Sequence, residues 1–368
     1  MQVTAAQVAA VADEIFGAPV TVAAWDAEQI AYESGSPATG GLLRVRGATT
    51  DGRPFSTFVK LIQHPRHWPR LHLLPEGFRD RFVAGFPWRQ ELDAWSDTFA
   101  GRLPAGLRVA ALHRLEDLGD DRLLLFMEDV DACPDGVWDV ALFIQAATAL
   151  GGLAALRGTP EILATNDRSP GWGLRGYADG RVLQAAVPAL ADDDLWRHPL
   201  LAATVDPDLR TDLGRIAEAV PAILDRLDAL PQALPHGDAS PQNLLVPRDD
   251  RGTLVAIDIS FQCPQAVGFD LGQLLIGLAH AGTLPAEGLA PVHERLVPAF
   301  LAGMAEYGGD ADADEVTYGY LGSLVVRAAL TSLPYEQLAG WPAEEPWELF
   351  RQRAALTRFL ADLGLGLL

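Results

Sequence analysis

The chain has 368 residues, of which 49% are hydrophobic, and it carries a formal net charge of −21. Its length favours two domains, and its charge disfavours nucleic acid and anionic membranes as partners, because both are bound through positive surfaces. No apolar run reaches the roughly 18 residues of a membrane span, no signal peptide is recognisable, and two cysteines do not indicate a disulfide framework or a zinc site. We therefore expect a cytoplasmic protein that does not bind a membrane or nucleic acid.

The first 62 residues predict one helix followed by short strands. Thr4 is suited to cap a helix over residues 4–16, and strand-like runs follow near 19–24, 28–33, 41–47 and 55–62. Segment 34–41 is a candidate nucleotide-binding loop, because glycines such as Gly40 and Gly41 let backbone N–H groups approach phosphates closely. It lacks the G-x-G-x-x-G pattern, and an ordinary hairpin turn is the more frequent meaning of such a loop.

Lys60 is the single lysine in a chain that has 28 lysine and arginine residues together. It lies in the predicted strand 55–62, where alternation places Phe58, Lys60 and Ile62 on one face. An ammonium is a compact point charge, whereas a guanidinium is a broad planar fork. A position that needs a small cation between polyphosphate oxygens would therefore retain lysine, although a surface lysine on a strand face is the simpler alternative.

The next hundred residues contain a helix and a buried strand. Segment 64–85 is rich in histidine, arginine, proline and aromatic residues and is expected to be a surface loop without an assigned role. Residues 87–99 predict a helix with Glu91 on the same side as its apolar stripe of Trp88, Leu92, Trp95 and Phe99. Residues 123–127 have the composition of a buried strand, which leads into Glu128-Asp129-Val130.

Beyond residue 130 the sequence is mainly helical and strongly acidic. Helices are predicted over 137–156, 208–229 and within 290–368, and segment 159–206 is richer in proline, glycine and aspartate. Asp192-Asp193-Asp194 is interpreted as a helix N-terminus, where the helix dipole favours acids. Residues 131–368 carry a net charge of −17, which would attract a cationic small molecule but would equally keep a protein soluble.

Residues 236–258 combine a polar loop with a predicted hairpin. His-Gly-Asp-Ala-Ser-Pro-Gln-Asn is followed by the apolar runs 244–246 and 254–257, which a polar turn joins. In an antiparallel hairpin the first residue of one arm faces the last of the other, so Asn243 and Asp258 should meet beside Asp238. Oxygen side chains that converge next to a carboxylate suit Mg²⁺, which shares its remaining ligands with water and phosphates.

This segment resembles the catalytic loop and metal site of the protein-kinase-like superfamily, in which an Asp base is followed five residues later by a metal-binding Asn. The Gly237 after His236 and the later Gly268-Phe269-Asp270-Leu271 are similar to the aminoglycoside phosphotransferase branch. Protein kinases usually have Arg at the position of Gly237 and Lys at that of Ser240, and the Phe-Gly after the metal-binding Asp is absent here. These differences favour a small-molecule substrate over a protein substrate.

The resemblance implies an α+β, bilobal protein-kinase-like fold. Residues 1–128 would form a small N-lobe, with an antiparallel sheet and a helix, that binds the nucleotide. Residues 129–368 would form a large, mainly helical C-lobe with the catalytic loop and the metal site. Within the C-lobe, segments 159–206 and 275–368 would shape the region that binds the acceptor.

The resemblance also implies roles for single residues. Asp238 would be the catalytic base, Asn243 and Asp258 would bind Mg²⁺, and His236 and Asp270 would be structural. For ATP or GTP, the implied binding residues are Lys60 with its partner Glu91 on the phosphates, Gly40 and Gly41 in the loop, and Met127, Glu128 and Val130 at the hinge around the adenine ring.

The expected function is an ATP-dependent O-phosphotransferase that acts on a free hydroxyl of a small molecule. Two acceptor classes remain open, namely an amine-bearing antibiotic such as an aminoglycoside, and a sugar, nucleoside or amino alcohol of metabolism. A catalytically silent kinase-fold protein that binds nucleotide is a further alternative, which the combined presence of Lys60, Asp238, Asn243 and Asp258 disfavours. A dinucleotide-dependent redox enzyme is disfavoured because no G-x-G-x-x-G follows a strand.

Overall fold

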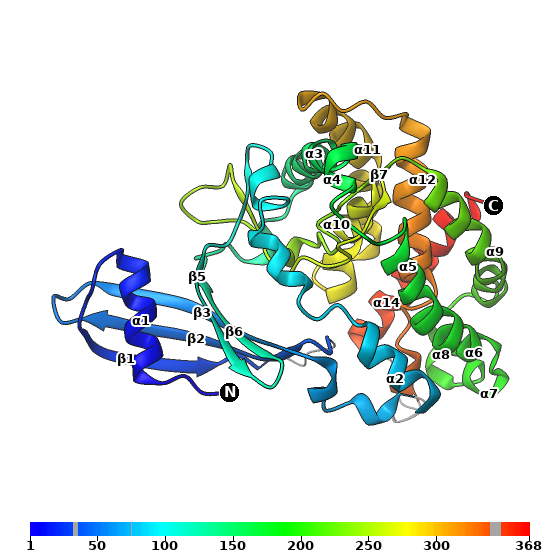
Figure 1. Ribbon diagram of the computed structural model, residues 1–368. Coiled ribbons are helices and arrows are strands. Elements are labelled where there is room, and N and C mark those ends of the chain that lie inside the picture. The colour runs from blue at the N-terminus through cyan, green and yellow to red at the C-terminus, as the bar shows by residue number, and fades with distance from the viewer. Residues whose placement is uncertain (32–35, 75, 339–346) are drawn as a thin grey trace. The chain divides into compact units, whose positions relative to one another are not determined.

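A computed structural model describes residues 1–31, 36–74, 76–338 and 347–368 (Figure 1). The chain divides into two compact units. The first unit comprises Met1–Ser96 and Val109–Asp131, and the second comprises Asp97–Arg108 and Ala132–Leu368. The chain thus contributes a short segment to the second unit before it returns to complete the first.

The first unit is built on an antiparallel sheet in the strand order β1-β2-β3-β6-β5. Its strands are β1 (Val22–Gln29), β2 (Thr39–Thr49), β3 (Pro54–Gln63), β5 (Leu112–Gly119) and β6 (Arg122–Glu128). Helix α1 (Ala5–Phe16) lies on one face of this sheet (Figure 1), where Val8 and Val11 pack against Val45, Val59 and Phe126.

Helix α1 begins and ends as its sequence predicts. The Thr4 hydroxyl accepts from the backbone N–H of Gln7, and the Gln7 side chain accepts from the backbone N–H of Thr4. This reciprocal pair satisfies two backbone donors that the first helical turn leaves without partners. Gly17 ends the helix in a left-handed conformation with φ of +66°.

The opposite face of the sheet carries a second hydrophobic cluster. Ile62 of β3 and Leu125 of β6 are its buried centre, against which Trp88, Leu92 and Trp95 pack. These three residues belong to the segment that connects β3 with β5. Its helical elements are η1 (Pro65–His67), η2 (Leu71–Leu73), α2 (Glu76–Gly85), η3 (Gln90–Trp95) and, already within the second unit, η4 (Ala100–Arg102). The predicted surface loop 64–85 therefore contains short helices.

Two predictions for the first unit are wrong in detail. Strands were expected near 19–24 and 28–33, but residues 22–29 form one edge strand, β1, and residues 32 and 33 lie outside the described residues. Most residues of β1 are exposed, so the strand shows little apolar alternation. The α-helix expected over 87–99 is instead the 3₁₀ helix η3, which ends where the Ser96 hydroxyl donates to the Asp93 carbonyl (2.6 Å). Phe99, expected on the same stripe, belongs to the second unit.

The glycines expected in a nucleotide-binding loop lie in a strand. Gly40 and Gly41 belong to β2 next to a register shift in its pairing with β3, whereas residues 32–35 of the expected loop lie outside the described residues. A Cβ atom at Gly40 would come within 2.7 Å of the Gln63 side chain and 2.8 Å of the Leu61 side chain. Packing against β3 is therefore the visible reason for glycine at position 40.

The second unit is mainly helical. Its longer helices are α3 (Val140–Arg157), α9 (Leu209–Ala229), α10 (Phe269–Ala281), α11 (Leu289–Glu306), α12 (Ala313–Leu324) and α14 (Glu348–Leu365). Shorter helices are η5 (Asp135–Val137), α4 (Pro160–Leu163), α5 (Trp172–Tyr177), the π-helical η6 (Ala178–Ala186), α6 (Val187–Ala191), α7 (Asp193–Trp196), α8 (Pro199–Thr204), η7 (Pro241–Asn243), η8 (Ala286–Gly288), the π-helical η9 (Val325–Ala329) and α13 (Tyr335–Leu338). The predicted helices over 137–156, 208–229 and within 290–368 are confirmed with shifted ends. Asp192 caps α7, as the helix-start interpretation expects.

Helices α3 and α11 lie side by side in the second unit (Figure 1). A Cβ atom at Gly151 of α3 would lie 1.9 Å from the Phe300 carbonyl oxygen, and one at Gly303 of α11 would lie 1.9 Å from the Thr148 carbonyl oxygen. Glycine at both positions therefore allows the two backbones to approach each other. Helix α3 is apolar and long enough to cross a membrane, but this packing is that of a core helix.

Short strands complete the second unit. Strands β4 (Leu107–Val109), β9 (Leu254–Ala256) and β8 (Leu244–Leu245) form one small sheet, and β7 (Gln232–Ala233) pairs with β10 (Gln265–Ala266) in another. Strands β8 and β9 are antiparallel, with Leu244 opposite Ala256. The hairpin predicted after the polar loop is therefore confirmed.

Candidate active site

The first unit brings Lys60 and Glu91 together. Lys60 lies in β3 opposite Leu125 of β6, on the sheet face that the second hydrophobic cluster covers. Its Nζ is 2.7 Å from Glu91 Oε2, and the two side chains are only 8% and 12% exposed. Glu91 reaches this position from the 3₁₀ helix η3, not from an α-helix. An ion pair in such a sheltered place holds the ammonium in one position.

The predicted hinge follows β6, and some of its backbone groups already form hydrogen bonds within the first unit. The Met127 carbonyl accepts a hydrogen bond from the Thr57 hydroxyl (2.8 Å). The Glu128 N–H donates to the Ala111 carbonyl (2.8 Å), so this N–H takes part in the hydrogen bonds of the first unit. The adenine-binding roles of Met127, Glu128 and Val130 stay predictions.

In the second unit, Asp238 and Asn243 are joined across the polar loop. Asn243 Nδ2 donates to the backbone carbonyl of Asp238 (2.9 Å) and to its carboxylate oxygen Oδ2 (3.1 Å). The turn η7 brings Asn243 back toward Asp238, and the Asn243 N–H donates to the Ser240 carbonyl (2.8 Å). Because the amide nitrogen faces Asp238, the amide oxygen of Asn243 points away from it.

Asp258 lies one residue further along the hairpin than expected. Asn243 is opposite Ile257, whose N–H donates to the Asn243 carbonyl (3.0 Å), so Asn243 and Asp258 do not face each other directly. Asp258 follows with φ of +55°, a left-handed conformation that is uncommon for a residue with a side chain. Such conformations cluster at functional sites. The negative charges of Asp270, Asp238 and Asp258 each act to raise the pKa of His236, against the larger effect of burial, which lowers it.

Gly237 allows the polar loop to pack against the segment that follows Asp258. Its φ is +90°, and a Cβ atom would lie 1.7 Å from the Ser260 carbonyl oxygen. The Ser260 N–H donates to the His236 carbonyl (2.9 Å), which joins the two segments. The structure therefore explains why no side chain can stand where protein kinases usually carry Arg.

We expect Gly237→Ala to lower the stability of the protein by about 2 kcal/mol or more, because it adds left-handed strain to a backbone clash. Activity should fall with it, since Asp238 is the next residue. Denaturant unfolding and turnover would be compared with those of Gly214→Ala, a glycine of α9 where an added Cβ has nothing within 4 Å. Equal stability of the two variants would contradict the close contact with Ser260.

His236 and Asp270 lie beneath the polar loop. The Asp270 carboxylate accepts from the backbone N–H groups of His236 and Gly237, each at 2.8 Å. His236 Nδ1 accepts from the Asp238 N–H (3.3 Å). Burial disfavours the charged form and is the largest influence on the pKa of both groups. It lowers the pKa of His236 and raises the pKa of Asp270. Both residues hold the backbone that carries Asp238.

Arg157 is a buried residue that sequence patterns did not single out. It ends α3 and is 1% exposed. Its Nη1 donates to the carbonyls of Leu234 (2.7 Å) and Pro235 (3.0 Å), which immediately precede the polar loop. Its Nε donates to the Thr98 carbonyl (3.0 Å), and its guanidinium stacks 4.4 Å above the Phe99 ring. One side chain therefore ties the 97–108 segment to the polar loop.

Arg327 also escaped the sequence analysis. It lies in η9, and its Nη2 is 2.7 Å from Asp238 Oδ1. Asp238 is thus held on both carboxylate oxygens, by Arg327 on one and by Asn243 on the other. No local pattern could have indicated this contact, because Arg327 is 89 residues from Asp238 in the chain.

The side chains in this region fit Mg²⁺ by their chemistry. The Asn243 amide oxygen and the Asp258 carboxylate are hard oxygen donors, which suit Mg²⁺ better than a transition metal. Across the described ranges, no three His, Cys, Asp or Glu side chains form a group that could hold a metal ion. A site with two protein ligands is compatible with Mg²⁺, which usually takes its other ligands from water and phosphates.

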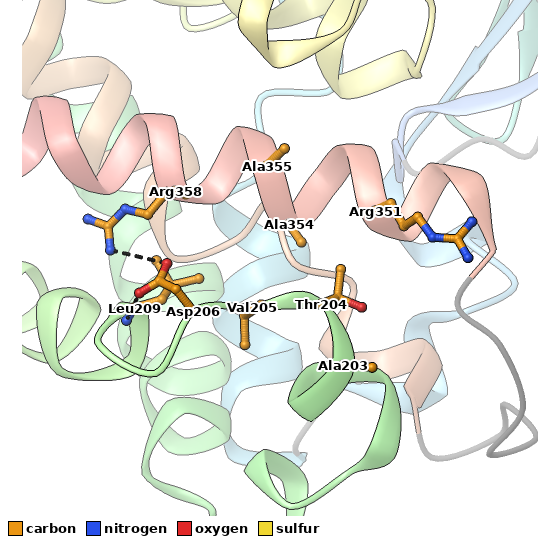
Figure 2. A pocket seen from close by; sticks show the side chains of 9 residues that line it. All are labelled: Ala203, Thr204, Val205, Asp206, Leu209, Arg351, Ala354, Ala355 and Arg358. Atoms are coloured by element: carbon orange, nitrogen blue, oxygen red, sulfur yellow. Dashed lines mark hydrogen bonds and ion pairs between the residues drawn. The ribbon is translucent and has the colours of Figure 1, made fainter.

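The second unit also contains a cavity of about 660 Å³, and none of the site residues described above lines it (Figure 2). Arg358 turns toward Asp206 across it, whereas Arg351 points away at the far end of α14. The Arg358 guanidinium is paired with Asp206, Asp212 and Asp362, and the Arg351 guanidinium lies 3.6 Å from Glu348. The remaining lining residues are Ala203, Thr204, Val205, Leu209, Ala354 and Ala355.

Comparison with solved structures identifies the fold. An ethanolamine kinase from Plasmodium vivax matches over 91% of this chain and 82% of its own, with a TM-score of 0.50 and 12% identity. The chain has the protein-kinase-like fold. An aminoglycoside phosphotransferase from Alicyclobacillus acidocaldarius covers 92% of both chains (TM-score 0.48, 14% identity). An amicoumacin kinase, in complex with AMP-PNP and Ca²⁺, covers 94% of this chain and 88% of its own (TM-score 0.48, 16% identity). No protein-family model and no curated protein matches the chain.

The protein-kinase-like fold confirms the expected α+β architecture, with an antiparallel sheet in the first unit and a helical second unit. At 12% identity the likeness concerns the fold alone. What the chain does therefore has to be argued from its own side chains.

Proposed function

We propose that the protein is an ATP-dependent O-phosphotransferase that moves the γ-phosphoryl group to a hydroxyl of a small molecule. The observation that carries this proposal is the Asp238 carboxylate, which Asn243 holds at 3.1 Å at the open end of a hairpin that leads to Asp258. The sheltered Lys60–Glu91 pair (2.7 Å) supports it from the first unit. A protein that only bound a nucleotide would have no use for a positioned carboxylate base.

Each residue has a role that follows from its chemistry. When bound, ATP and Mg²⁺ supply the phosphoryl group and the charge that balances it. Asp238 would orient the acceptor hydroxyl and accept its proton. Asn243 and Asp258 would hold Mg²⁺ through oxygen atoms, and Lys60, fixed by Glu91, would hold the α- and β-phosphates. His236 and Asp270 would keep the catalytic loop in place from behind.

We assign nucleotide binding to residues 1–128 and acceptor binding to parts of 129–368, including 159–206 and 275–368. GTP is an alternative nucleotide, and the cytoplasm, where ATP is available, is the proposed compartment. The acceptor belongs to one of two classes, an amine-bearing antibiotic or a metabolic sugar, nucleoside or amino alcohol. The net charge of −17 over residues 131–368 favours the first.

Mass spectrometry tests this function directly. The protein would be incubated with Mg²⁺, ATP or GTP and a mixed panel of aminoglycosides, nucleoside antibiotics, sugars and amino alcohols. A mass gain of about 80 Da on one compound, absent with Asp238→Asn, would establish the reaction and its acceptor class. Nucleotide binding without any mass gain would instead favour the catalytically silent alternative.

A further inference from the structure

The guanidinium of Arg327 is bound to the catalytic loop at two points. Nη2 donates to Asp238 Oδ1 (2.7 Å), and Nη1 donates to the Gly237 carbonyl (2.8 Å). The guanidinium also lies 4.6 Å from the Phe261 ring centre and 6.0 Å from that of Phe269. Aromatic contacts and two directed hydrogen bonds restrict the guanidinium to one orientation. The Arg327 side chain is 14% exposed, against 32% for Asp238.

The backbone around Arg327 has an unusual conformation. Helix α12 passes into the π-helical segment η9, which contains Arg327. The Arg327 carbonyl accepts hydrogen bonds from the hydroxyls of Thr331 (2.8 Å) and Tyr177 (3.0 Å). Single π-helical turns inside α-helices occur frequently at functional sites. Here the wider turn presents the arginine to the catalytic loop.

Arg327 has more donors than the loop uses. A guanidinium carries five N–H donors, and within the described part of the chain the hydrogen bonds to Gly237 and Asp238 use one donor from each terminal nitrogen. A hydroxyl that approaches Asp238 brings its neighbouring substituents close to the remaining donors. Oxygen atoms on those substituents would accept hydrogen bonds, whereas an ammonium group would be repelled.

We propose that Arg327 is a positioning residue that fixes the Asp238 carboxylate for the acceptor hydroxyl, and that its charge selects acceptors with an oxygen substituent, not an ammonium group, next to that hydroxyl. The inference rests on the proposed phosphotransferase function and narrows its substrate class. It distinguishes the positive charge of Arg327 beside Asp238 from the net negative charge of residues 131–368. Amines remote from the reacting hydroxyl are unaffected by it.

The test compares Arg327→Met, which removes both charge and hydrogen bonds, with Arg327→Lys, which keeps the charge. With the acceptor found in the panel, Arg327→Met should lower kcat about 100-fold, the scale of a misplaced catalytic group, while the KM for ATP stays unchanged. Arg327→Lys should recover part of this loss. Arg226→Met, which removes an exposed arginine that stacks on Tyr318, serves as the matched control. Thermal unfolding of each variant would identify a loss caused by misfolding.

Selectivity supplies a readout that a purely structural role would not move. The acceptor would be compared with its analogue in which the neighbouring hydroxyl is an ammonium group. The wild-type protein should prefer the hydroxyl compound, and Arg327→Met, but not Arg327→Lys, should reduce this preference. Wild-type turnover in Arg327→Met, or a wild-type preference for the ammonium compound, would overturn this inference alone. A wild-type protein that phosphorylates no compound would overturn it together with the proposed function.

Discussion

Asp238→Asn is expected to lower turnover by about 10³-fold while ATP binding is retained. The carboxamide has the shape of the carboxylate and can still accept a hydrogen bond from Arg327 through its oxygen. Its NH₂ group cannot accept from Asn243 Nδ2, but the bond from Asn243 to the Asp238 backbone carbonyl remains, so the loop should keep its course. It cannot take the proton of the acceptor hydroxyl, and general-base catalysis contributes roughly 10²–10⁴-fold. Turnover would be followed by the mass-gain assay, and nucleotide affinity by calorimetry.

The matched control for this variant is Asp249→Asn, which removes an exposed carboxylate from the turn of the same hairpin. It should leave both turnover and nucleotide affinity unchanged. If Asp238→Asn turned over within a few-fold of the wild-type rate, Asp238 would not be the base. If it lost nucleotide binding as well, its effect would have to be assigned to the shape of the loop.

Lys60→Met should reduce kcat/KM for ATP by about 100-fold, in the range found when one fixed donor to a reacting group is removed. It should also destabilise the first unit, because the Glu91 carboxylate, which is 12% exposed, would lose its partner at 2.7 Å. Breaking a buried pair from one side costs about 3–5 kcal/mol, and the small remaining exposure places this pair toward the lower end. Denaturant unfolding and ATP kinetics would measure the two effects separately.

The double variant Lys60→Met/Glu91→Gln separates stability from function. It removes both charges, so it should recover stability without recovering the use of ATP. Arg46→Met is the matched control on the same sheet, because its ion pair with Glu28 (3.2 Å) is about 60% exposed on both sides and should contribute little. Recovery of ATP kinetics in the double variant would contradict a direct phosphate contact by Lys60.

The core of the catalytic loop could be predicted because its signal is local. Asp238 and Asn243 lie on one short loop, and the two apolar runs that follow predict their own pairing. The position of Asp258 was one residue off, because apolar alternation cannot reveal that this residue turns into a left-handed conformation. The structure places it after the residue that faces Asn243.

The ion pair of the first unit was expected from the family resemblance, and it forms although the expected secondary structure is wrong. The spacing of Trp88, Leu92 and Trp95 indicated an apolar stripe with Glu91 on the same side, and the structure packs this stripe on the sheet. That spacing cannot distinguish a short 3₁₀ helix within a packed connection from a regular α-helix. Gly40 shows the opposite case. This glycine was expected to let the backbone approach phosphates, but in β2 close packing against the side chains of β3 explains why position 40 is glycine.

The two arginines could not be found from the sequence. Arg157 and Arg327 contact the catalytic loop and the residues just before it through partners that lie 77 and 89 residues away in the chain. Folding brings these partners together through helix packing, which leaves no repeating pattern around either residue. The parts of the site that depend on long-range contacts therefore needed the structure.

The excursion of residues 97–108 into the second unit affects how the chain can be made and divided. The ribosome synthesises Phe99, which is fully buried against Arg157, well before α3 exists. Because domains generally fold as units from the N-terminus onward, this segment has to wait without its partners while the first unit forms. A cut after residue 131 would leave residues 97–108 attached to the first unit and separated from the second unit, to which they belong. Exchange of lobes between related proteins would therefore require three junctions, near residues 96, 109 and 131, and not one.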